Sequence, residues 1–334
     1  MVPKVAGSNP VIHPKLCPNR PLEIGTFLFI MNWLKIKTYT EISLAMVFWA
    51  ASFIWYKEAY LYLGPMTLIF IRLIVSSVFL FSLMAILKRL EMVKTKDIPI
   101  FLLLALVEPL LYFLGESYGM QIVSSTVGSV IISTIPLFTP FAALIFYKEK
   151  ISWYKMAGIT ISFFGVLLVI MGKGFQLIAP VEGIALMFLA VISAVCHSVI
   201  IAYLLPRYRI LTIILGQSAL GVLYFLPIFL LTEWELAKEI NWSWTVIEPI
   251  IKLGVFPSSL SFIFYARTVR ILGITRTNVF INFIPIFTAF MSFYLLNEEM
   301  SLGKIIGILV VISGLLFAQS EGLRKSTLNN SKNR

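Results

Sequence analysis

The sequence repeats itself at a constant offset of 149 residues, and this repeat constrains the fold more than any other feature of the chain. The clearest matching pairs are Thr126 and Thr275, Pro136 and Pro285, Glu149 and Glu298, Ser152 and Ser301, and Gly158 and Gly307. No insertion or deletion interrupts the match between Thr126 and Leu167. A duplicated membrane unit with an odd number of spans must insert upside down in its second copy. The repeat therefore predicts two related halves of opposite orientation, provided that the chain spans a membrane.

Composition assigns most of the chain to a membrane. Of its 334 residues, 59% are hydrophobic and only 13% are charged, whereas soluble domains carry about 25% charged residues. The mean hydropathy is +0.92. No soluble core of this size could bury so much apolar surface, so lipid must surround most of the chain. We therefore expect an all-α integral membrane protein.

The net charge of +11 does not indicate nucleic acid as a partner. The basic residues lie in short loops between apolar stretches, where they act as topology signals beside anionic lipid headgroups. They form no contiguous basic face of the kind that nucleic acid needs. The chain has two cysteines, two histidines and a single aspartate, Asp97, so we expect no disulfide framework, no metal site and no cofactor.

Ten apolar stretches are long enough to cross a bilayer as helices. They lie near residues 41–62, 65–87, 97–118, 122–146, 152–171, 182–204, 209–231, 248–268, 273–296 and 301–320. Together with the repeat, they predict ten transmembrane helices arranged as two inverted five-helix repeats. The first repeat is expected over residues 31–175 and the second over residues 176–322.

Every second loop is rich in lysine and arginine, from Lys35 and Lys37 before the first span to the basic tail at 323–334. The intervening loops carry little positive charge. By the positive-inside rule we expect a multi-pass protein of the plasma membrane, which is the inner membrane in a bacterium, with both termini in the cytoplasm. Five spans in each half then make the two halves antiparallel, as the repeat requires.

The first thirty residues differ from the rest of the chain. Val5–Pro10 resembles the conceptual translation of a transfer-RNA gene, whose T-arm can read as Gly-Ser-Asn-Pro. Two interpretations stay open: either Met31 is the true start, or residues 1–30 form a disordered tail. The apolar stretch at Phe27–Ile30 is too short for a convincing signal peptide.

Prolines interrupt the fourth and ninth spans near the middle of the bilayer. Pro136 and Pro140 lie in the fourth span, and Pro285 lies at the matching position of the ninth. Proline removes a backbone donor and frees carbonyls from the helical ladder. Within a membrane those groups must be satisfied by protein or by cavity water. We therefore expect both breaks to line a site or a moving interface.

Polar side chains lie on the same helical face as these breaks. Ser129 and Ser133 precede Pro136 at helical spacing, and the offset of 149 maps them onto Asn278 and Asn282. These residues are candidates for binding a polar ligand from both halves. The alternative is that they hold neighbouring helices together, an explanation that fits the serines better than the amides, which are costly to bury.

Glu108 is the strongest single candidate for a functional residue. It lies near the middle of the third span, with Tyr112 and Glu116 following at i+4 and i+8 on one face. A carboxylate within a membrane is expensive, so it should face a cavity or a cation, and a proton-coupling or amine-binding role follows. The alternative is a structural partner for a cation such as Arg72. Either glutamate could be the functional one.

Three further residues have open interpretations. Trp49 could offer an aromatic wall to a cavity, or it could be a packing anchor. A hydrogen-bonded core histidine is favoured over a proton relay for His197 in the sixth span. Snorkelling to the headgroups is favoured for Arg72, because long basic side chains near span ends commonly do so.

The chain from about Thr40 to Ser320 resembles the drug/metabolite transporter superfamily, and within it the EamA-type carriers. The resemblance rests mainly on Ile135–Phe138 running to Glu149 and on Ile284–Phe287 running to Glu298. It implies a ten-helix carrier with a central cavity, usually exporting amino acids or related metabolites. Glu108 with Pro109 does not belong to the general pattern and points to a subgroup with its own substrate or coupling ion.

These observations predict a secondary active transporter that works by alternating access around a midplane cavity, with a small polar molecule as substrate and protons as a candidate coupling ion. A polytopic membrane enzyme acting on lipid-linked substrates is the first alternative. Two histidines, one aspartate and no clustered carboxylates argue against such an enzyme. A non-transporting membrane sensor or subunit is the second alternative.

Overall fold

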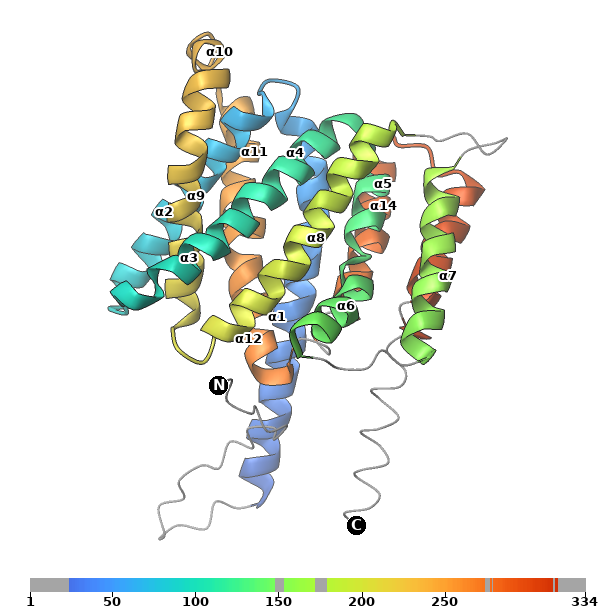
Figure 1. The fold of residues 1–334 in the computed structure, drawn as a ribbon, viewed down its shortest axis with the longest axis horizontal. Coiled ribbons are helices and arrows are strands. Elements are labelled where there is room, and N and C mark those ends of the chain that lie inside the picture. Colours follow the sequence, from blue (N-terminus) through green and yellow to red (C-terminus); the bar gives the residue numbers. More distant parts are fainter. Residues whose placement is uncertain are drawn as a thin grey trace.

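The computed structural model describes residues 24–147, 153–171, 179–273, 277, 279–314 and 316–317, and these residues form helices joined by short turns (Figure 1). The first half of the chain contains α1 (Ile24–Ala59), α2 (Pro65–Ile86), the short turn η1 (Thr95–Asp97), α3 (Ile98–Ala105), η2 (Leu106–Leu111), α4 (Tyr112–Ile122), α5 (Ser125–Ile132), α6 (Ile135–Tyr147) and α7 (Trp153–Ile170). The second half contains α8 (Val181–Leu204), α9 (Ile210–Thr232), α10 (Trp234–Lys238), α11 (Trp244–Val255), η4 (Phe256–Ser261), α12 (Phe262–Leu272), η5 (Val279–Phe283), α14 (Ile284–Leu295) and a last helix, Leu302–Gly314.

Five helical segments are long and apolar enough to cross a membrane. They are Pro65–Ile86, Thr95–Ile122, Val181–Leu204, Ile210–Thr232 and Trp244–Leu272. Shorter apolar helices cover Ser125–Thr139, Met156–Ile170, Phe280–Leu295 and Leu302–Gly314. Large apolar side chains such as Ile86, Leu231 and Phe290 are exposed on the outside of the bundle, where only lipid would accept them. The chain is a multi-pass membrane protein.

The two halves of the chain interlock. Helix α1 of the first half packs against α11, α12 and α14 of the second, while α8 packs against α4 and α9 packs against α2. Figure 1 shows α8 crossing in front of α1, with α4 and α5 beside its upper part. A central space between these helices is therefore built from both halves.

Two helices are interrupted by wide, π-helical turns near their middle. The first turn is η2, where Glu108 takes an extended backbone conformation (φ −145°, ψ 114°) directly before Pro109. The second turn is η4, which contains Pro257. The hydroxyl groups of Ser258 and Ser259 donate to the carbonyl groups of Leu253 and Gly254, at 2.8 Å each, and so satisfy acceptors near this break. The sequence pattern does not predict either interruption, because it assigns continuous helices to both spans.

The predicted breaks at Pro136 and Pro285 lie at the starts of helices. Helix α6 begins at Ile135 and α14 begins at Ile284, so each proline occupies the first turn, where its missing N–H costs nothing. The turn that precedes α6 is closed by Thr134, whose hydroxyl donates to the carbonyl of Ile131 at 2.6 Å. Each proline therefore marks the point where one helical segment ends and the next begins.

Helix α7 and the helix Leu302–Gly314 approach each other very closely through glycines. A Cβ atom on Gly165 would lie 2.9 Å from the carbonyl oxygen of Gly307, and one on Gly314 would lie 2.8 Å from that of Gly158. Midway between these contacts, the hydroxyl of Ser162 donates to the carbonyl of Val311 at 3.0 Å. Small residues permit such close backbone packing within a membrane.

Replacing Gly307 by alanine is expected to destabilise this helix pair by about 1–3 kcal/mol, because a closely packed backbone cannot absorb an added methyl group. The new Cβ would lie 2.8 Å from the carbonyl oxygen of Gly165. Gly303→Ala is the matched control on the same helix, since its nearest neighbour would lie 3.7 Å away. Thermal unfolding in detergent compares the two variants, and equal midpoints would contradict the close approach.

Candidate functional site

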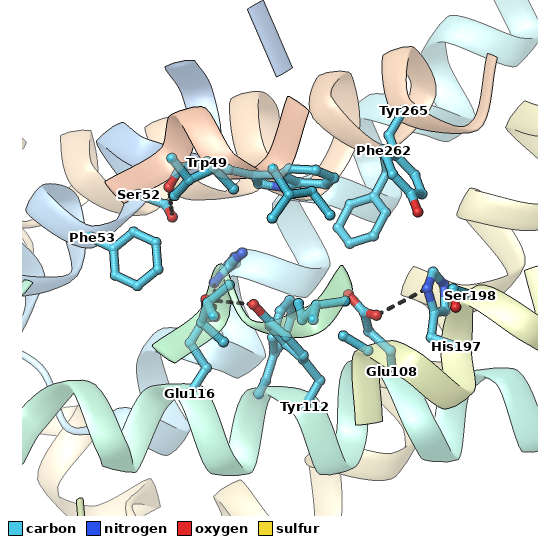
Figure 2. Close-up of a pocket in the computed structure, with 17 residues that line it drawn as sticks. Trp49, Ser52, Phe53, Glu108, Tyr112, Glu116, His197, Ser198, Phe262 and Tyr265 are labelled. Atoms are coloured by element: carbon cyan, nitrogen blue, oxygen red, sulfur yellow. Dashed lines mark hydrogen bonds and ion pairs between the residues drawn. The ribbon is translucent and has the colours of Figure 1, made fainter. Parts of the chain in front are cut away.

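A central cavity of about 70 Å³ lies between the two halves and is large enough for several water molecules or a small ligand (Figure 2). Its lining side chains come from α1, α2, η2, α4, α5, α6, α8, α12, η5 and α14. They are Trp49, Ser52, Phe53, Arg72, Glu108, Tyr112, Phe113, Glu116, Ile132, Ile135, Ala194, His197, Ser198, Phe262, Tyr265, Ile281 and Ile284. Aromatic rings form much of the wall, and the charged groups are Arg72, Glu108 and Glu116.

Glu108 is brought to the cavity by the interruption in its own helix. Because the backbone at Glu108 is extended rather than helical, its side chain leaves the helix at the break and turns toward α8. There its Oε2 lies 3.1 Å from Nδ1 of His197. On the other side of the imidazole, Nε2 lies 3.0 Å from Oε1 of Gln217 on α9. Glu108, His197 and Gln217 are each less than 5% exposed.

Glu116, eight residues after Glu108 in the chain, is the centre of a second polar cluster. The hydroxyl of Tyr56 donates to Glu116 Oε2 at 2.7 Å, and that of Tyr112 donates to Oε1 at 3.0 Å. The guanidinium of Arg72 lies 3.8 Å from Oε2 and also donates to the hydroxyl of Tyr56. Both carboxylate oxygens of Glu116 are therefore satisfied.

Arg72 is fixed by its remaining contacts as well. Its Nε donates to the hydroxyl of Ser258 at 2.5 Å, and its guanidinium carbon lies 4.2 Å from the centre of the Phe113 ring. The side chain is 3% exposed. The snorkelling interpretation of Arg72 is therefore wrong, because the cation is buried in an ion pair with Glu116, and it is not the partner of Glu108.

The charges of the cavity do not balance when both glutamates are ionised. Arg72 compensates Glu116, whereas Glu108 has no lysine or arginine within ion-pair distance in the part of the chain that the structure describes. The neutral form of His197 supplies a hydrogen-bond partner but no charge. A buried, uncompensated carboxylate is costly. While His197 is neutral, Glu108 must therefore hold a proton or face a cation that enters the cavity.

Trp49 and Tyr112 lie in the cavity wall, as do both glutamates. The indole N–H of Trp49 donates to the carbonyl of Pro257 at 3.2 Å, and its ring packs against Phe262 and Tyr265 at centroid distances of 5.5 Å. The indole N–H is thus bonded to the backbone at the break η4, while the ring of Trp49 lines the cavity. Figure 2 shows Trp49 on the side opposite Glu108 and Tyr112.

The predicted serines lie outside the cavity wall. Ser129 and Ser133 are fully buried, and their hydroxyls donate to the carbonyls of Thr126 and Val130 on their own helix, at 2.9 and 2.7 Å. Both hydroxyl protons are therefore used within their own helix. The residue of α5 that lines the cavity is Ile132, not Ser129.

Asn282 is buried beside the cavity, between the lining residues Ile281 and Ile284. Neither its amide nitrogen nor its oxygen finds a hydrogen-bond partner within the described residues. A buried amide without partners is unusual and indicates a group that bonds water or a ligand. Asn278 lies outside the described residues, and so does the side chain of Pro140, whose backbone belongs to α6. Pro285 is buried at the start of α14.

His197 and Gln217 are site residues that the sequence pattern alone does not select. The sequence favours a hydrogen-bonded core position for His197. The structure gives its ring two partners, and one of them is the carboxylate of Glu108 in the cavity wall. Gln217 is a lone amide within the apolar run of α9. That isolation was the available signal, since a buried amide requires partners.

At one end of the bundle, Glu298 joins the loop after α14 to the turn between α4 and α5. Glu298 accepts from the backbone N–H of Thr126 at 3.3 Å and from Nζ of Lys304 at 2.9 Å. Burial alone would raise the pKa of Glu298, but the hydrogen bonds from Lys304, Ser124 and Thr126 lower its pKa below the ordinary value. The hydroxyl of Ser301 accepts from the N–H of Lys304 at 3.3 Å, as expected of a helix cap.

Apolar helices of membrane-spanning length surround a central cavity that contains buried charged groups, which is typical of a membrane transport protein, and the comparisons agree. The model of the EamA-like transporter family matches residues 37–171 and again residues 181–319. The chain therefore belongs to the EamA-like transporter family, within the drug/metabolite transporter superfamily.

Known relatives are transporters of similar length. A protein of Archaeoglobus fulgidus described as an uncharacterized transporter is 26% identical over 280 residues, which cover 84% of this chain and 98% of that protein. The uncharacterized transporter YdfC of Bacillus subtilis is 26% identical over 279 residues, covering 82% and 88% of the two chains. A crystal structure matches with a TM-score of 0.64 at 12% identity over 84% of this chain and 98% of the other, which supports the fold.

Proposed function

We propose that the protein is a secondary active transporter that exports amino acids or related small polar metabolites by alternating access. In this mechanism the two halves rock around the central cavity and open it to one side of the membrane at a time. The observation that carries the proposal is Glu108, a buried carboxylate without a lysine or arginine partner in the described residues, in a cavity built from both halves. A carrier has a use for such a group because a cation or a proton can occupy it in turn.

The two halves are proposed to be inverted five-helix repeats over residues 31–175 and 176–322. Glycine packing supports this symmetry, because Gly158 and Gly165 of α7 meet Gly314 and Gly307, which are their own repeat equivalents in exchanged order. Such reciprocal contact is expected around a two-fold axis in the membrane plane. The breaks η2 and η4 occur at corresponding places in the two halves and add further support.

The proposed orientation has both termini in the cytoplasm of a cell whose plasma membrane, or bacterial inner membrane, holds the protein. The basic loops support this orientation. The end at which Glu298 bonds Thr126 would then face the outside.

The cavity chemistry suits a substrate with an amino group and a modest apolar body. An ammonium group would neutralise Glu108, and the aromatic faces of Trp49, Tyr112 and Phe262 would attract the same cation. The amide of Asn282 has free hydrogen-bonding capacity beside the cavity for a polar substituent or a water molecule. Protons are the proposed coupling ion because they compete with an amine for the same carboxylate.

A two-stage experiment tests the transporter proposal. Cells that overproduce the protein are first screened for resistance to toxic amounts of single amino acids and amine metabolites. The purified protein is then placed in liposomes loaded with an unlabelled hit, and uptake of the same labelled compound is measured by counterflow. Transient accumulation that needs the protein is expected, whereas resistance without counterflow for any hit would contradict carrier function.

A further inference from the structure

Glu108, His197 and Gln217 form a continuous hydrogen-bonded row across three elements of the bundle. The row starts at the break η2, crosses α8 and ends on α9. The imidazole is held edge-on against the ring of Phe262, with centroids 5.9 Å apart and an interplanar angle of 85°. Its two nitrogens therefore point at fixed partners, and Figure 2 shows the first of these contacts.

The hydrogen bonds of this row determine where protons lie. A neutral imidazole carries one N–H, so one nitrogen donates and the other accepts. The oxygen of Gln217 faces Nε2, which must then carry the proton. Nδ1 is left as an acceptor at 3.1 Å from Glu108 Oε2, and the contact is satisfied only if the carboxyl group carries a proton.

Turning the amide of Gln217 gives a second fully bonded arrangement. Its NH2 group would donate to Nε2, the imidazole would carry its proton on Nδ1, and Nδ1–H would donate to an ionised Glu108. The second arrangement contains one proton fewer. In the change the carboxyl proton passes to Nδ1, and the proton on Nε2 leaves to water.

We propose that Gln217 is a positioning residue that acts through His197 to set the protonation of Glu108. With its oxygen toward the imidazole it stabilises the protonated carboxyl of a cavity that holds no cation, and with its NH2 group there it stabilises the carboxylate that binds a cation. This proposal rests on the proposed carrier function, and it names Gln217 as the residue that couples proton binding to substrate binding at Glu108.

Other charged and titratable groups around Glu108 come from several elements. Tyr112 and Glu116 lie on α4, Arg72 on α2 and Tyr265 on α12, and all of them line the same cavity. Arg72 and Glu116 hold each other, so they contribute little net charge at Glu108. Tyr112 and Arg72 both contact the carboxylate of Glu116, whereas Gln217 contacts Nε2 of His197 and is therefore placed to select its tautomer.

The test titrates Glu108 with the proton itself as the probe. The purified protein in liposomes is titrated by infrared spectroscopy, and the carboxyl band of Glu108 is isolated by subtracting the spectrum of the same protein carrying Glu108→Gln. Gln217→Met keeps the shape of the side chain but removes its strong acceptor. Gln217→Glu keeps an oxygen acceptor. Gln121→Met, at an exposed glutamine, is the matched control.

The titration contains no amine, so the amide of Gln217 is expected to keep its oxygen toward the imidazole, as in the structure. Gln217→Met then removes a hydrogen bond that supports the protonated carboxyl, and the titration midpoint of Glu108 is expected to move to lower pH by about one unit. Gln217→Glu is expected to keep the midpoint at or above that of the wild type, and Gln121→Met to leave it unchanged. Midpoints that stay at the wild-type value in both Gln217 variants, or fall in both, would overturn the proposal.

The result does not depend on transport. If the Gln217→Met protein fails to accumulate, the titration midpoint of Glu108 in the Gln217→Glu protein decides the test. A midpoint below that of the wild type would exclude an acceptor role for residue 217. If counterflow fails for every substrate while the midpoints move as expected, the carrier proposal falls and the coupling of the three residues stands.

Discussion

Replacing Glu108 by glutamine is expected to remove pH-dependent transport while leaving the protein folded. Glutamine fills the same space and can still bond His197, but it can neither release a proton nor carry a charge. Losing one partner of a buried charge pair costs about 3 kcal/mol, which corresponds to a loss of about 100-fold in amine affinity. Counterflow in proteoliposomes at several pH values measures the effect.

Glu182→Gln is the matched control for this prediction. Glu182 is exposed at the start of α8, far from the cavity wall, so the same chemical change there should leave the rate and pH profile unchanged. If Glu108→Gln transported at the wild-type rate with the wild-type pH profile, Glu108 would have no part in coupling or amine binding, and the proposed mechanism would lose its main residue.

Replacing Arg72 by methionine is expected to cost about 3–5 kcal/mol of stability, because it leaves Glu116 as an unpaired charge in a buried site. The side chains of Arg72 and Glu116 are 3% and 5% exposed. Adding Glu116→Gln to Arg72→Met should recover much of the loss, since a neutral amide no longer needs the cation. Thermal unfolding in detergent reports the single and double variants.

Arg207→Met provides the comparison at the surface. Arg207 lies 3.7 Å from Asp97, but its side chain is 45% exposed, so its removal should cost no more than about 1 kcal/mol. Equal losses for Arg72→Met and Arg207→Met would contradict a buried ion pair. A double variant as unstable as Arg72→Met alone would show that the cation stabilises the fold by packing rather than by charge.

Much of the helical framework could be predicted because apolar length and loop charge are local properties of the sequence. Runs such as Pro65–Ile86 and Val181–Leu204 are almost uniformly apolar, and the structure has helices there. The interruptions at Glu108 and at Pro257 were missed, although both sites contain proline. A proline can start a helix, kink it or break it, and neighbouring helices decide which by satisfying the freed backbone groups.

The site was predicted only in part, for a related reason. An intramembrane carboxylate such as Glu108 signals a polar cavity by its cost alone, and Tyr112 follows it at helical spacing. The contacts of Arg72 with Glu116 and of His197 with Gln217 depend on how separate helices are rotated against each other. Periodicity gives the polar face of one helix but not the neighbour that it meets. It therefore predicts Ser129 and Ser133 in the cavity wall, whereas they lie outside it.

Side-specific labelling of a single cysteine tests alternating access most directly. Ser52→Cys places a thiol of similar size in the cavity wall, in a chain whose Cys17 and Cys196 are replaced by serine. A membrane-impermeant thiol reagent is applied to intact cells and to inside-out vesicles. Ser243→Cys, exposed beside α11 at the proposed outer end, is the control and should react from outside only. The account predicts that the cysteine at position 52 reacts from both sides, and reaction from one side alone would contradict a central site that opens to each side in turn.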